Sequence, residues 1–183
     1  MAAATHTKTA KTGAEMIDRL SRRAMMFCGA AALAGCGTRG PRFLVYTGPE
    51  VTGIVASKSS RTMLLLHGSA VLQSYRFELG FAPDGHKRVE GDGRTPEGQY
   101  WIDRRNPASE FHLSLGISYP NAADRVAAAA VGKPPGGDIF IHGTPSNYLG
   151  ISDWTVGCLA VTNDEMEVIY SMVKDGTPIW INP

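Results

Sequence analysis

The sequence predicts a mainly β fold, a sandwich or barrel with two short α-helices. Most apolar residues lie in short runs of β-branched and aromatic side chains, and turn-forming residues separate these runs. Only the segments 121–131 and 163–173 have the composition and spacing of helices. The chain has 183 residues, of which 43% are hydrophobic and 19% charged, so it is long enough for one domain with a core and too apolar for a disordered protein.

Strands are expected through the first part of this domain. The strand-like runs lie at 43–46, 61–67, 71–79, 99–103 and 111–118. The turn formers His67-Gly68-Ser69-Ala70 indicate a hairpin between the second and third runs. A glycine-rich loop at 85–98 separates the first three of these runs from the last two.

Helices and strands are expected to mix in the last third. The alanine-rich segment 121–131 begins at Asn121 and is stopped by Gly132. A strand is expected at 138–142 and another at 177–182. The helix at 163–173 has Thr162 or Asn163 as its cap. Its apolar face is formed by Met166, Ile169, Tyr170 and Val173.

Residues 1–35 are predicted to be an export signal. The run 24–35 has twelve residues and no charge, which is too short to span a bilayer but typical of a cleavable signal. Leu33-Ala34-Gly35-Cys36 resembles the bacterial lipoprotein box, so we expect lipid on Cys36 and a short tether at 36–41, followed by the folded domain at 42–183. A buried first helix is the alternative, although the run has no helical polar spacing.

The start and the export route stay open. The chain can begin at Met1 or Met16, and Arg22-Arg23 resembles a twin-arginine signal without excluding the general secretory route. We expect a periplasmic protein held by its lipid, with the outer membrane preferred, because Gly37 gives no reason for retention at the inner one. Residues 1–35 carry five Lys/Arg against two Asp/Glu, which leaves 13 against 15 in the remainder, so no nucleic-acid surface is predicted.

Cys158 is the candidate nucleophile. If Cys28 leaves with the signal and Cys36 carries lipid, Cys158 is the only thiol left and has no intrachain disulfide partner. An unpaired Cys in an oxidising compartment is either a buried, inert side chain or one kept for chemistry. The preceding Gly157 favours chemistry, because it allows the tight turn that aims backbone N–H groups of Gly157 and Cys158 at an oxyanion.

His142 is the candidate base. It ends the apolar run Ile139-Phe140-Ile141, and the fifteen residues between it and Cys158 are rich in turn formers, so the loop can fold back. The imidazole would take the thiol proton and later return a proton to a leaving amine. The carbonyl of Gly143 can orient the imidazole ring.

Three stretches resemble the catalytic domain of bacterial L,D-transpeptidases, which has the YkuD-type fold. They are Ile139–His142, the turn Trp154–Cys158 and the loop Gly91–Tyr100, and the likeness runs from about residue 42 to the C-terminus. The resemblance implies a β-sandwich enzyme with Cys158 as nucleophile, His142 as general base and then acid, and the Gly143 carbonyl as ring orienter. The family attacks the diaminopimelate carbonyl of a peptidoglycan tetrapeptide stem, releases D-alanine and passes the acyl group from a thioester to an amine.

The sequence departs from the commonest family motif. That motif has a second His before the Gly-Cys pair and an Arg or Asn two residues after the Cys, where this chain has Val156 and Ala160. The gap from His142 is also somewhat short. Some family members with a Val-Gly-Cys turn hydrolyse a peptidoglycan link, so hydrolysis is one alternative. A catalytically inactive lipoprotein that binds wall peptides is the other.

The remaining candidates concern binding. We expect Trp154, Thr155 and Tyr119 to contact the substrate, although Trp154 is as well suited to fill the core beneath the loop. Arg94 is expected to pair with Asp92 or Glu97.

No metal or organic cofactor is expected, because the ligand-type residues form no close pair. His67, His86 and His112 are expected to lie on the surface or to be satisfied in the core. We expect a monomer that acts on peptidoglycan stem peptides and binds the membrane only through its lipid.

Overall fold

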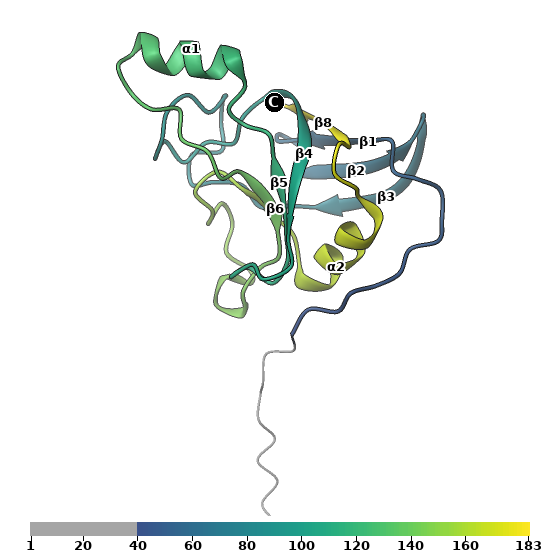
Figure 1. Cartoon of the computed structure of the whole chain (residues 1–183). Coiled ribbons are helices and arrows are strands. Elements are labelled where there is room, and N and C mark those ends of the chain that lie inside the picture. The colour runs from purple at the N-terminus through teal and green to yellow at the C-terminus, as the bar shows by residue number, and fades with distance from the viewer. Residues whose placement is uncertain (1–39) are drawn as a thin grey trace, which may run out of the picture. The chain divides into compact units, whose positions relative to one another are not determined.

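A computed structural model of the chain describes residues 40–183, in which eight strands form one curled sheet (Figure 1). The strands are β1 (Gly53–Ser57), β2 (Thr62–His67), β3 (Ala70–Arg76), β4 (Gly98–Asn106), β5 (Ser114–Ile117), β6 (Phe140–His142), β7 (Leu159–Ala160) and β8 (Pro178–Asn182). The helices are α1 (Ala122–Ala130) and α2 (Asn163–Met172), with one 3-10 turn, η1 (Ser146–Tyr148).

The sheet has the strand order β3-β2-β1-β8-β4-β5-β6-β7. A register irregularity between Ile102 and Arg104 lets the long strand β4 pair with β8 at one end and β5 at the other. Such irregularities bend a strand, so the sheet folds into two facing parts. The residues after β3 then return to β7 through a bridge between Glu78 and Ala160. This bridge joins the two ends of the strand order and confirms the predicted mainly β sandwich or barrel.

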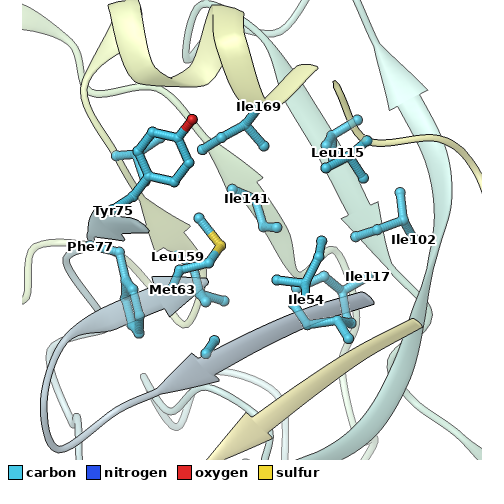
Figure 2. Close-up of a cluster of buried hydrophobic side chains, with 14 of the residues drawn as sticks. Ile54, Met63, Tyr75, Phe77, Ile102, Leu115, Ile117, Ile141, Leu159 and Ile169 are labelled. Atoms are coloured by element: carbon cyan, nitrogen blue, oxygen red, sulfur yellow. The ribbon is translucent and has the colours of Figure 1, made fainter. Parts of the chain in front are cut away.

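The hydrophobic core lies between the two parts of the sheet (Figure 2). In each strand alternate residues point inward, and on β2 these are Met63 and Leu65, neither of which is exposed to solvent. Complete burial of one such side chain contributes about 1.5–3 kcal/mol. Other members shown in Figure 2 are Ile54, Phe77, Ile102, Leu115, Ile117, Ile141, Leu159 and Ile169.

Both predicted helices are present, and side chains cap both N-termini. Asn121 accepts a hydrogen bond from the Asp124 N–H at the start of α1, and Thr162 does the same for Glu165 in α2. Thr162 is therefore the cap of α2. This helix lies against β5 and β6, whereas α1 lies at another edge of the domain (Figure 1).

Three strand predictions need correction. Residues 43–46 form no strand, and Val45 is 90% exposed; the apolar run is a lead-in segment that passes α2. The sequence does not predict β1, because its five residues include Gly53 and lie between polar turns. The strand expected at 111–118 starts only at Ser114, since His112 adopts a left-handed backbone conformation with φ 74°.

The predicted export signal at 1–35, the lipidated Cys36 and most of the tether at 36–41 lie outside the described residues. Within residues 40–183, the structure has no helix with the length and apolar character needed to span a membrane.

Candidate active site

Strand pairing puts His142 and Cys158 on one face of the sheet. Strands β6 and β7 run parallel, with Ile141 opposite Leu159 and His142 opposite Ala160. Ile141 and Leu159 point into the core and are fully buried. Because strand side chains alternate, His142 and the residue before β7, Cys158, point to the other face. Their Cα atoms lie diagonally across neighbouring strands. The ordinary spacing between strands and the rise per residue put these two atoms about 8 Å apart.

The His142 ring is held in one orientation. Its Nδ1 atom lies 2.7 Å from the Gly143 carbonyl oxygen, which can only accept a hydrogen bond, so Nδ1 carries the proton and Nε2 has the free lone pair. Phe111 stacks on the ring at 4.6 Å between centroids, and Trp154 meets it edge-on at 5.5 Å. Nε2 makes no hydrogen bond within residues 40–183. The predicted ring-orienting contact of Gly143 is thus present, and Nε2 is available to accept a proton.

Burial sets the protonation states of the pair. Burial lowers the pKa of His142 below its ordinary value, and the hydrogen bond to Gly143 only partly opposes this effect. Burial also raises the pKa of the Cys158 thiol to about 11. At neutral pH the resting pair is therefore a neutral imidazole and a thiol, and the thiolate forms only when a base removes its proton. The thiol donates at 3.5 Å to the carbonyl oxygen of Asp138.

Thr155 holds the turn that presents the thiol. Its hydroxyl donates to the Cys158 carbonyl at 2.9 Å and accepts from the Gly157 N–H at 3.1 Å. The Gly157 N–H, a predicted oxyanion donor, is therefore engaged in this state and would have to leave the Thr155 hydroxyl to serve a substrate. Thr155 is only 3% exposed, so the structure gives it a supporting part in the turn, whereas the sequence predicts a substrate contact.

Gly157 is required by close backbone packing. Its φ is 127°, and a Cβ atom there would lie 2.5 Å from the carbonyl oxygen of Arg94. Thr95 in the same loop donates through its hydroxyl to the Gly157 carbonyl at 2.9 Å. The glycine-rich loop is thus a buttress beneath the thiol-bearing turn.

Asp92 shapes this loop from within. Its carboxylate accepts from the backbone N–H groups of Arg88, Val89 and Arg94 and from the Lys87 ammonium group. Burial opposes ionisation, but these donors together hold the pKa of Asp92 below its usual range. The predicted ion pair of the Arg94 side chain is wrong. Among the described residues Lys87 pairs with Asp92, and Lys58 pairs with Glu97.

The other two candidate binding residues, Trp154 and Tyr119, lie in different surroundings. Trp154 is half-buried, contacts the His142 ring and stacks on Tyr148 at 4.2 Å, so it borders the site. Its indole N–H is buried without a hydrogen-bond partner in the described part of the chain. Tyr119 is only 4% exposed, and its hydroxyl donates to the Pro135 carbonyl. That side chain has no free surface for a substrate, which contradicts the prediction for Tyr119.

A buried acidic residue that the sequence does not single out supports the His142 region. Glu167 is 2% exposed and accepts hydrogen bonds from the backbone N–H and side chain of Arg42. Oε1, which accepts from the Arg42 backbone N–H, also lies 3.0 Å from Nε2 of His112. The neighbouring Phe111 carbonyl accepts from the Gly143 N–H at 3.0 Å. Glu167 therefore anchors the turn that packs on Gly143 and on the His142 ring.

The remaining histidines lie elsewhere, in keeping with the expectation for them. His67 is exposed and bonds the Glu50 carbonyl, while His86 bonds Asp124. Within residues 40–183, no three His, Cys, Asp or Glu side chains come together in a group that could hold a metal ion.

Comparison with known proteins decides the family. The model of the YkuD family, the L,D-transpeptidase catalytic domain, matches residues 52–181. The chain belongs to this family. It is 30% identical over 107 residues to the Escherichia coli K12 protein named "Putative L,D-transpeptidase YafK", a match that covers 56% of this chain and 37% of that protein.

Solved structures share the fold. The helical cell shape determining protein Pgp2 of Campylobacter jejuni superposes with a TM-score of 0.58 at 24% identity, covering 78% of this chain and 51% of that one. Bd1075 of Bdellovibrio bacteriovorus gives 0.52 at 24% identity, covering 76% of this chain and 51% of that one. This L,D-transpeptidase-family chain thus spans about a third of the length of the curated relative it matches and about half the length of these two structures.

Proposed function

We propose that the chain is a cysteine-dependent L,D-transpeptidase that acts on peptidoglycan tetrapeptide stems through a thioester. The observation that carries the proposal is the shared face of His142 and Cys158, with Nδ1 of the imidazole committed to Gly143 and Nε2 left to accept a proton. Family membership supplies the substrate class, because the matched family model describes the L,D-transpeptidase catalytic domain.

The chemistry follows from these two side chains. Nε2 of His142 takes the Cys158 proton as Sγ bonds to the diaminopimelate carbonyl carbon and the carbonyl oxygen becomes an oxyanion. The bond from this carbon to the D-alanine nitrogen then breaks, and the imidazolium gives its proton to the departing amine. An amine of a second stem attacks the thioester, the carbon–sulfur bond breaks, and the proton lost by that amine returns to sulfur through His142.

Hydrolysis of a peptidoglycan link is the second candidate. Ala160 and the 65% exposed Val156 stand where the commonest family motif has polar groups, and this difference supports a changed substrate geometry. Water would then replace the acceptor amine in the second step. A wall-peptide-binding protein without activity is the third reading, and the same assay separates it from both enzymes.

The test uses the full chain and a synthetic tetrapeptide stem. Mass spectrometry of the intact protein is expected to find the stem, less D-alanine, on Cys158, and none of this adduct in Cys158→Ala. Dimeric products from paired stems indicate a transferase, and trimmed monomers or a freed anchor protein indicate a hydrolase. A wild-type protein that binds stems but forms neither adduct nor product would reject the enzymatic proposal.

We also propose export and lipid anchoring through Cys36. The support is the apolar run before Cys36 and its lipoprotein-box sequence. The protein would lie in the periplasm and, by preference, at the outer membrane. Wild-type protein is expected in the membrane fraction and Cys36→Ser in the soluble fraction, whereas a wild-type protein that is wholly soluble would refute the anchor.

A further inference from the structure

A cavity lies beside the catalytic face, over Ala160. Its volume is about 190 Å³, and the side chains that line it include Arg76, Glu78, Trp154, Ala160, Thr162 and Glu165. Neither His142 nor Cys158 lines it. Its place is nevertheless fixed by the sheet, because Ala160 pairs with His142 on one side and with Glu78 on the other.

These pairings form a row of three side chains on one face. The backbone of Glu78 exchanges two hydrogen bonds with Ala160, at 2.8 and 2.9 Å, so the two residues lie directly opposite each other. Phe77 and Leu79 point into the core, which sends Glu78 and Arg76 to the face of Ala160 and His142. The methyl group of Ala160 thus forms the floor of the cavity, between the imidazole of His142 on one side and the charged side chains of Arg76 and Glu78 on the other.

The charges over this floor have both signs. None of the ion pairs within residues 40–183 involves Arg76, which leaves its guanidinium group for a ligand. Glu78 Oε2 accepts from the Asp153 N–H and lies 4.0 Å from Arg61, while Oε1 makes no hydrogen bond in the described part of the chain. Glu165 Oε2 is held by Thr162 at the start of α2, which directs that carboxylate. One guanidinium and two carboxylates in a small cavity match a group that carries both an anion and a cation.

We propose that this cavity binds the free, zwitterionic end of a diamino-dicarboxylic acid in the acyl donor, with Arg76 on its carboxylate and Glu78 on its ammonium. This assignment rests on the proposed function. The side chain of diaminopimelate places that end four carbon–carbon bonds from the Cα next to the attacked carbonyl, roughly 5 Å when extended. Glu78 lies diagonally from Cys158, about 8 Å between Cα atoms. Once the thiol turns from the Asp138 carbonyl toward the cavity, the two side chains can reach the two ends of one residue.

The cavity also explains how the chain manages without an Arg or Asn at position 160. A long side chain there would occupy the floor and meet Glu78. With Ala160 the space is open, and the positive charge comes from β3. Trp154 also lines the cavity, and its buried indole N–H has no hydrogen-bond partner in the described part of the chain.

The experiment compares three tetrapeptide stems with the full chain. The first has free meso-diaminopimelate, the second has its side-chain carboxyl group amidated, and the third has lysine, which keeps the ammonium only. All three retain the D-alanine carboxylate, so a preference among them reports the side-chain end alone. We expect the wild type to acylate Cys158 with the first stem about 10- to 100-fold faster than with the other two, the usual effect of a charge-assisted hydrogen bond.

Variants assign this preference to the cavity. Arg76→Gln is expected to reduce the ratio between the free and amidated stems to about one, Arg76→Lys to keep part of it, and Glu78→Gln to weaken all three stems. Arg125→Gln on the exposed face of α1 is the matched control and is expected to keep the wild-type ratio. Circular dichroism and melting curves confirm that each variant is folded.

Calorimetry of Cys158→Ala with the three stems measures binding alone, because this variant cannot form the thioester. Equal rates and affinities for the three stems, or an Arg76→Gln protein that keeps the preference, would overturn the inference and leave the proposed function standing. A wild type that forms no adduct with any stem, while Cys158→Ala binds none, would reject both.

Discussion

Replacing Thr155 by Val tests whether its hydroxyl holds the thiol-bearing turn. Valine keeps the shape of the side chain but loses two hydrogen bonds, one to the Cys158 carbonyl at 2.9 Å and one from the Gly157 N–H at 3.1 Å. The bond to the Cys158 carbonyl contributes about 1 kcal/mol, and loss of the other bond, which leaves the buried Gly157 N–H without a partner, costs about 1–3 kcal/mol. The free energy of unfolding is therefore expected to fall by about 2–4 kcal/mol.

The assay is urea unfolding of the full chain, followed by tryptophan fluorescence. A domain of this size should also lose about 5–15 °C in Tm. Thr155→Ser keeps the hydroxyl and is the matched control, which should lose about 1 kcal/mol for the missing methyl group. A Thr155→Val protein within 0.5 kcal/mol of the wild type would show that the turn does not depend on this hydroxyl.

The remaining predictions concern Glu167, the proposed base His142 and Gly143. Burial opposes the ionisation of Glu167, but its hydrogen bonds from Arg42 and His112 outweigh this effect and lower its pKa. The stability that its charge contributes is therefore present when the pH is above the ordinary pKa of glutamate, and it is lost as the pH falls below that pKa. Urea titrations from pH 7 to pH 3 should therefore find that the stability gap between wild type and Glu167→Gln narrows; a constant gap would contradict this account. Because burial lowers the pKa of His142, the acid limb of the acylation rate should have its midpoint below the ordinary value of about 6.5, and a midpoint above it would mean that the imidazole is stabilised as a cation. Gly143→Ala should be poorly folded or inactive, since its Cβ would lie 2.9 Å from the backbone carbonyl oxygen of Phe111 and 2.3 Å from Oδ1 of Asn163. A variant with wild-type melting and acylation would refute the close packing.

Local signals predict much of the fold. Both helices begin at the predicted caps, because Asn121 and Thr162 act on N–H groups only three residues away. The segment 43–46 shows the limit of this approach. It has strand composition, but no strand within residues 40–183 pairs with it, and Phe43 lies against Tyr170 of α2 instead.

The candidate pair His142 and Cys158 is predictable for a related reason. A Gly-Cys turn after a strand that ends in His requires only one loop to fold back, and β6 and β7 pair in that way. The supporting residues could not be found from spacing. Glu167 reaches His112 over 55 positions of sequence, and the row that holds Ala160 depends on a bridge to Glu78, 82 positions away. Such contacts come from sheet closure, which no local pattern encodes.

The place of β8 has a consequence for synthesis of the protein. This strand lies between β1 and β4 in the middle of the sheet, although its residues are made after all the others in the domain. Until Pro178–Asn182 have left the ribosome, no strand links β1 to β4, and the two halves of the sheet can meet only on the side of the bridge between Glu78 and Ala160. Contacts so distant along a chain form slowly. A nascent chain therefore has β6 and β7, the strands beside His142 and Cys158, before it has β8, and the sheet is completed only after the rest of the domain has been made.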